Sequence, residues 1–109
     1  MHNFVLLSEK KLNKFDSIGK LFIHDSGAQL IHIENEDINR TFSLTFKTPA
    51  FNDKGIPHIL EHMVFTGSEN YKVADPFNEL MKSSLYTYLN EITFYDKTVF
   101  PIASYNLSE

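Results

Sequence analysis

The feature that most constrains this chain is a His-x-x-Glu-His sequence at positions 58, 61 and 62. On an α-helix, which turns about 100° per residue, His62 lies about 40° to one side of His58 and Glu61 about 60° to the other. Residues four apart have Cβ atoms about 5 to 6 Å apart, and tetrahedral zinc with bonds of about 2.0 to 2.1 Å needs ligand nitrogens about 3.3 Å apart. The two imidazoles can therefore share one zinc ion, with a carboxylate beside them.

The opposite side of this helix is apolar, because Ile59, Leu60, Met63 and Val64 occupy it. We expect the protein to bury that side and so to hold the ligands still. The residue order is the inverse of the more familiar His-Glu-x-x-His order of zinc peptidases. A chance pair of histidines on an amphipathic helix is the competing interpretation, since the chain has five histidines. The pentapeptide by itself leaves both interpretations open.

Composition and charge limit the classes of protein that fit. The 109 residues suffice for one domain with a modest core, and 42% apolar with 14% aromatic residues is typical of a folded chain. A net charge of -4 provides no basic surface for nucleic acid or an anionic membrane. No cysteine is present, so any metal falls to His, Asp and Glu. No segment approaches the roughly 20 apolar residues that span a bilayer, and we expect a soluble, cytoplasmic protein.

Turn signals and alternation predict strands before the helix. Residues 1–13 suit a short strand or an arm laid across a sheet. Residues 20–24 and 28–33 are rich in β-branched residues and flank a turn-prone Asp-Ser-Gly at 25–27, which predicts a hairpin. Residues 41–46 alternate strictly between polar and apolar side chains, as a half-buried strand does.

Two histidines and an acidic stretch in this region have simpler interpretations than metal binding. His24 and His32 fall within the predicted hairpin without a partner at ligand spacing, and we interpret both as structural histidines. Residues 34–39 are polar and acidic but lack a calcium-loop pattern, so we predict a solvated turn.

Proline and glycine predict the ends of the helix that carries the histidines. Pro57 suits its first turn, and Gly67 suits its C-terminal cap. A second helix is predicted from Asp75, as N-cap, to about Lys82, with Pro76 in the first position.

Beyond the second helix, residues 85–94 and 98–103 are rich in aromatic and β-branched residues and predict a second hairpin. Its tyrosines and phenylalanines lack the interleaved basic residues of a nucleic-acid surface. The order β-β-β-α-α-β-β predicts an α+β fold with an antiparallel sheet packed with helices.

Many residues match a known family together. They are residues 55–62 and 67–68, Tyr71, 75–77, Lys82, 84–85, 89–90, Thr93, 96–98 and 101–104, with 27–28 and 42–49 upstream. On these residues the chain resembles the N-terminal part of the pitrilysin-type, insulinase-like zinc metallopeptidases, and within them the presequence protease and falcilysin branch. The resemblance runs from about residue 18 to residue 104.

The resemblance implies roles for four residues. His58 and His62 match the family's zinc ligands, and Glu61 matches its general base. Asn90 matches a residue of the edge strand against which the family holds an extended peptide substrate. The family's third ligand is a glutamate on a later helix, beyond this chain. Three glutamates match no ligand position: Glu69, Glu79 and Glu91.

Some residues depart from the family. Glu91 stands where the family usually has a small residue, and its carboxylate either repels acidic substrates or points away from the zinc. Lys72, Ser83 and Tyr95 replace the family's usual proline, glycine and proline. Family members are also far longer, with four related domains that enclose the substrate. We therefore expect residues 1–109 to form a single partial metallopeptidase domain.

Two functions fit these observations. The first is a zinc-dependent endopeptidase that cleaves unstructured peptides. This chain would then be one piece of a longer or split enzyme. If the enzyme is split, a separate chain supplies the remainder. The second is a catalytically inactive remnant that binds zinc weakly or serves as a protein-interaction module. Neither involves nucleic acid or a membrane. An open sheet edge and an incomplete core also predict that the isolated chain is unstable or self-associates.

Overall fold

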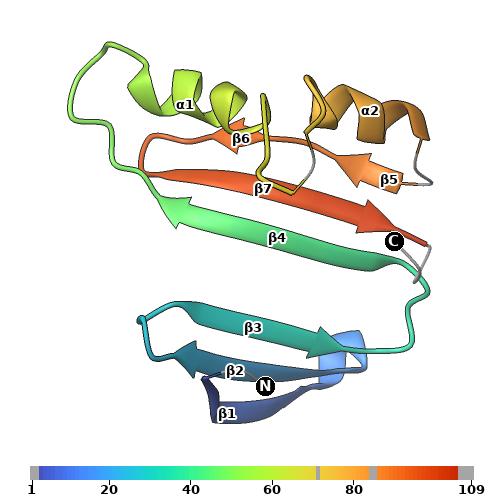
Figure 1. The fold of residues 1–109 in the computed structure, drawn as a ribbon. Helices are drawn as coiled ribbons and strands as arrows, with labels where there is room; N and C mark the ends of the chain where they lie inside the picture. The colour runs from blue at the N-terminus through green and yellow to red at the C-terminus, as the bar shows by residue number, and fades with distance from the viewer. Residues whose placement is uncertain (1–2, 71, 84–85, 106–109) are drawn as a thin grey trace. The chain divides into compact units, whose positions relative to one another are not determined.

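The computed structural model describes residues 3–70, 72–83 and 86–105 (Figure 1). Some predictions lie outside the described residues. They are the family match at Tyr71 and at residues 84–85, the start of the predicted strand 85–94, and the first two residues of the predicted N-terminal strand. The chain consists of two compact units, Met1–Asp37 and Ile38–Glu109, and each is described by itself. Within the described residues, no helix has both the length and the apolar character needed to cross a membrane.

The first unit is a three-stranded antiparallel sheet (Figure 1). Strand β1 (Phe4–Leu12) leads through a short 3-10 turn, η1 (Asn13–Phe15), into β2 (Ser17–His24), which pairs with β3 (Gln29–Glu34). The turn between β2 and β3 contains Gly27 at a φ of 87°, a left-handed conformation that glycine adopts without strain. The predicted first hairpin is confirmed.

The second unit has a four-stranded antiparallel sheet in which β7 (Lys97–Ser104) is central. Strand β4 (Arg40–Lys47) pairs with one side of β7, and β5 (Tyr86–Leu89) and β6 (Ile92–Thr93) pair with the other. Both helices lie on the same side of this sheet (Figure 1). The predicted α+β class with antiparallel pairing is confirmed, although the strands form two sheets instead of one.

The predicted strand over residues 85–94 is interrupted at Asn90 and Glu91. The side-chain Oδ1 of Asn90 accepts a hydrogen bond from the backbone N–H of Glu91 at 2.9 Å, a local contact that competes with regular strand pairing. The backbone N–H of Asn90 still donates to the carbonyl of Pro101 on β7 at 3.2 Å. The two residues therefore follow the edge of the sheet between β5 and β6.

Helix α1 (Ile56–Val64) carries the His-x-x-Glu-His sequence. Gly55 precedes it at a φ of 68°, and Pro57 lies in the first turn as predicted. The predicted cap at Gly67 is wrong, because Gly67 does not have a left-handed φ and the helix ends two residues earlier, at a cap formed by Phe65. Instead, the hydroxyl of Thr66 donates to the last-turn carbonyl of Met63 at 2.7 Å, so a left-handed glycine is not needed.

Helix α2 (Pro76–Ser83) begins as the sequence predicts. The carboxylate of Asp75 accepts hydrogen bonds from the side chain and the backbone N–H of Asn78, the latter at 3.1 Å. These bonds hold the pKa of Asp75 below its ordinary value, with the side-chain bond as the larger cause. Because folding lowers the pKa of Asp75, the cap stabilises the folded state at pH values above the pKa that Asp75 has in the unfolded chain. This stabilisation is lost as the pH falls through the lower pKa that Asp75 has in the folded chain.

The apolar side of α1 is exposed, which corrects the expectation that it is buried. Ile59, Leu60, Met63 and Val64 have 58%, 55%, 59% and 53% of their surface accessible. Glu61 lies against the sheet instead and is only 3% exposed, whereas His58 and His62 are exposed. Within the second unit, no described residue covers the apolar side.

A small aromatic cluster anchors the end of α1 to the rest of the second unit. The ring of Phe65 lies 5.4 Å from that of Phe77 on α2 and 5.3 Å from that of Phe100 on β7, measured between centroids. Tilted and edge-on pairs at these distances are favourable. This cluster fixes where α1 ends relative to α2 and the sheet, and so positions the last histidine of the motif.

Candidate metal centre

Helix α1 brings His58, Glu61 and His62 together, as the sequence predicts. The Nε2 atoms of His58 and His62 lie 3.1 Å apart, and the rings are tilted by 42° with centroids 4.9 Å apart. One ligand atom from each of the three residues lies within 4.8 Å of the others. Among the described residues, this is the one group of at least three potential ligands. The separation of the two nitrogens is close to the roughly 3.3 Å that tetrahedral zinc requires.

The carboxylate of Glu61 is buried against β6, on which α1 packs. The hydroxyl of Thr93, on β6, donates a hydrogen bond to Oε2 of Glu61. A buried carboxylate needs such a donor because burial removes its bonds to water. Thr93 therefore holds the carboxylate beside the two imidazoles.

Replacing Thr93 by valine is expected to lower the free energy of unfolding by about 1 to 3 kcal/mol, because it leaves a buried acceptor without its donor. Valine keeps the shape of threonine, so the loss reports the hydroxyl. The measurement is urea unfolding followed by circular dichroism. Thr93→Ser, which keeps the hydroxyl, is the matched control and should lose less. Equal losses in the two variants would contradict this role of the hydrogen bond.

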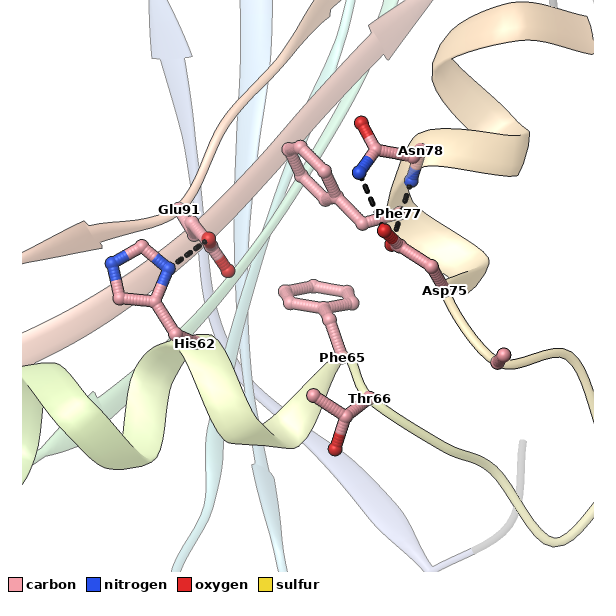
Figure 2. Close-up of a pocket in the computed structure, with 8 residues that line it drawn as sticks. His62, Phe65, Thr66, Asp75, Phe77, Asn78 and Glu91 are labelled. Atoms are coloured by element: carbon pink, nitrogen blue, oxygen red, sulfur yellow. Dashed lines mark hydrogen bonds and ion pairs between the residues drawn. The ribbon is translucent and has the colours of Figure 1, made fainter.

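Glu91 is the residue of the site that sequence reasoning missed. Its Oε1 lies 2.9 Å from Nδ1 of His62, so its side chain points toward the site and not away from it (Figure 2). The available signal was its spacing from Thr93, because residues two apart on a strand project from the same face. What the sequence did not reveal is that α1 covers that face.

A pocket of about 240 Å³ opens beside His62, between the end of α1 and the start of α2 (Figure 2). Its walls combine two aromatic rings with polar and acidic groups. The lining residues are His62, Phe65, Thr66, Ala74, Asp75, Phe77, Asn78 and Glu91.

Asn90 and the remaining histidines lie outside the cluster. Asn90 is exposed at the sheet edge, where its side-chain amide donates to the hydroxyl of Tyr88 at 3.2 Å. His24 is the last residue of β2, and its Nδ1 accepts a hydrogen bond from the backbone N–H of Ser26 at 3.1 Å. His32 is exposed on β3. Neither histidine belongs to a group of at least three potential ligands among the described residues.

The donor set of the site fits zinc. Two imidazole nitrogens at 3.1 Å are suitable borderline ligands, and a buried carboxylate lies beside them. Oε2 of Glu91 is also buried without a hydrogen-bond partner among the described residues, so this region has negative charge that a cation would compensate.

Comparison with known proteins identifies related chains. Protein HypA of Clostridium perfringens is 46% identical over 104 residues, which is 94% of this chain and 11% of that protein. Presequence protease 1 of Arabidopsis thaliana, named as chloroplastic and mitochondrial, is 43% identical over 97% of this chain and 10% of its own length. The mitochondrial presequence protease of Yarrowia lipolytica is 40% identical over 100% of this chain and 11% of its own length. No family model matches the chain.

Two of these relatives are named as proteases, a class of peptidases. More narrowly, the chain belongs to the presequence protease family, as the resemblance in the sequence implies. The chain spans about a tenth of the length of the relatives that it matches.

Proposed function

We propose that this chain provides the zinc-binding segment of a metalloendopeptidase that cleaves unstructured peptides. The observation that carries the proposal is the pair of histidine Nε2 atoms 3.1 Å apart on α1, with the buried carboxylate of Glu61 beside them. The presequence protease relatives support a peptidase with this site. The assignment to a pitrilysin-like domain is part of the proposal.

Four residues have roles in the proposed reaction. His58 and His62 would hold zinc, which when bound would supply Lewis acidity for the attack of water on a peptide carbonyl. The carboxylate of Glu61 accepts a proton from the attacking water and donates it to the leaving amine. Thr93 keeps that carboxylate in place through its hydroxyl.

The sheet edge formed by β5 and β6 is the proposed site for the substrate. An extended peptide adds to such an edge through backbone hydrogen bonds, which favours unstructured peptides over folded proteins. Asn90 lies on this edge, exposed, between the two short strands. In the proposed function, its side chain contacts the backbone of a peptide that lies along these strands.

The proposed enzyme needs polypeptide beyond this chain. A catalytic zinc ordinarily has three protein ligands, and the third is the later glutamate that the family resemblance implies. The exposed apolar side of α1, formed by Ile59, Leu60, Met63 and Val64, supports a contact with that further polypeptide. The remainder is either the same protein or a separate chain. The cytoplasmic location stays a prediction.

The test is a chimera in which this chain replaces the matching segment of the Arabidopsis thaliana presequence protease 1. The chimera is expected to cleave a quenched unstructured peptide, to lose activity when a chelator removes the metal, and to regain it with zinc. The unmodified Arabidopsis protein is the control for the assay. A chimera that binds zinc but cleaves nothing, beside an active control, would favour the alternative of an inactive remnant.

A further inference from the structure

The nitrogen of His62 that faces away from His58 is in contact with Glu91. Nε2 of His62 lies 3.1 Å from Nε2 of His58, whereas its Nδ1 lies 2.9 Å from Oε1 of Glu91. The two nitrogens of one ring therefore have different partners: another imidazole on one side and a carboxylate on the other. Figure 2 shows the ring of His62 with Glu91 at one of its nitrogens.

The register of the sheet edge brings Glu91 to this position. Leu89 pairs with Ile102 and Ile92 pairs with Val99, so the intervening Asn90 and Glu91 continue along β7 without an inserted residue. Side chains alternate along such an edge, so Glu91 and Thr93 share a face while Asn90 lies on the other. The shared face is the one against which α1 packs, because the hydroxyl of Thr93 reaches Glu61 on that helix.

A neutral imidazole carries one N–H and one lone pair, and the partner of one nitrogen decides which nitrogen carries the proton. A carboxylate only accepts hydrogen bonds, so Glu91 selects the form of His62 with its proton on Nδ1. That form leaves a lone pair on Nε2, directed toward the Nε2 of His58. Carboxylates that bind a ligating histidine in this way orient the ring and increase its basicity toward the metal.

We propose that Glu91 is the positioning residue of His62, which fixes the tautomer and the ring orientation with which His62 presents Nε2 to zinc. The proposal rests on the proposed function, because the role of Glu91 presumes that His62 binds a metal. It assigns to Glu91 neither of the two roles that the sequence suggested, repulsion of acidic substrates or a side chain pointing away.

The burial of Glu91 supports the same role. Its side chain is only 14% exposed, and its Oε2 is buried without a hydrogen-bond partner among the described residues. A carboxylate in such surroundings is costly unless positive charge lies nearby. Zinc on the far side of the imidazole of His62 would provide that charge, transmitted through the Nδ1 hydrogen bond.

Two measurements on the 109-residue chain test the proposal with the variants Glu91→Ala and Glu91→Gln. The first is nitrogen NMR of the His62 ring in the metal-free chain, under conditions that keep the imidazole neutral. The second is calorimetric titration with zinc alone. Glu69→Ala, which removes an exposed glutamate outside the site, is the matched control for loss of charge. Circular dichroism verifies that each variant is folded.

The unmodified chain is expected to show His62 with its proton on Nδ1. Glu91→Ala should lose this preference and weaken zinc binding by about 10- to 100-fold. Glu91→Gln should keep the preference, because its amide oxygen still accepts the hydrogen bond, and should lose less affinity. Glu69→Ala should change neither quantity.

Retention of the Nδ1–H form and of the zinc affinity in Glu91→Ala would overturn the proposal. A chain whose zinc affinity depends on His58 and His62 but not on Glu91 would leave the proposed function intact and reject this inference alone. Absence of zinc binding by the unmodified chain would count against the proposed function. In that case the tautomer of His62 in the metal-free samples still decides whether Glu91 orients the ring.

Discussion

Replacing Glu61 by glutamine in the chimera is expected to slow peptide cleavage by about 10²- to 10⁴-fold, the usual contribution of a general base. Glutamine keeps the size of the side chain and its oxygen can still accept the hydrogen bond from Thr93. It cannot take a proton from water. The zinc content should not change, because the imidazoles of His58 and His62 hold the metal in the proposed site.

The assay for Glu61→Gln follows cleavage of a quenched unstructured peptide, with the zinc content of each sample measured by atomic absorption. Glu69→Gln is the matched control, since Glu69 is an exposed glutamate beyond the end of α1, and it should leave cleavage unchanged. If Glu61→Gln cleaved the peptide as fast as the unmodified chimera, Glu61 would not be the general base.

Replacing His62 by alanine is expected to weaken zinc binding by more than about 100-fold. Loss of a residue that only hydrogen-bonds a ligating histidine typically lowers the affinity for the metal by about 10- to 100-fold, and loss of the ligand itself should lower it further. The variant removes one of two imidazole nitrogens that are 3.1 Å apart and leaves Glu91 without its partner. His58→Ala should have a comparable effect, since the two nitrogens face each other across the same site.

Calorimetric titration of the 109-residue chain with zinc measures both histidine variants. His32→Ala is the control, because His32 is an exposed histidine on β3 in the other unit and belongs to no group of potential ligands among the described residues. The prediction is wrong if the three alanine variants bind zinc with the same affinity. It is also wrong if His32→Ala alone loses binding.

Local signals predicted much of the secondary structure. The alternation of residues 41–46 gave β4, the Asp-Ser-Gly turn gave the first hairpin, and Asp75 with Pro76 gave the start of α2. These features depend on neighbours in sequence, so a short window of residues specifies them. Two other local predictions were wrong. Thr66 binds the last-turn carbonyl of α1 in place of a cap at Gly67, and the side chain of Asn90 interrupts the predicted strand over residues 85–94.

The orientation of α1 shows why the sequence was insufficient. Its hydrophobic pattern predicts a buried apolar side, yet that side is exposed and Glu61 lies against the sheet. An amphipathic pattern identifies two sides of a helix, but the surface available to cover each side is a property of the fold. Here Thr93 on β6 binds Glu61, and no described residue of the second unit covers the apolar side.

The sequence by itself determined that His58, Glu61 and His62 share one face of a helix, because residues three and four apart are neighbours on any α-helix. It also determined the family, through matches spread along nearly the whole chain. Only the tertiary structure decided that Thr93 binds Glu61 and that Glu91 binds Nδ1 of His62. These contacts join an edge strand to a helix far away in sequence, and their geometry depends on strand register and helix rotation together.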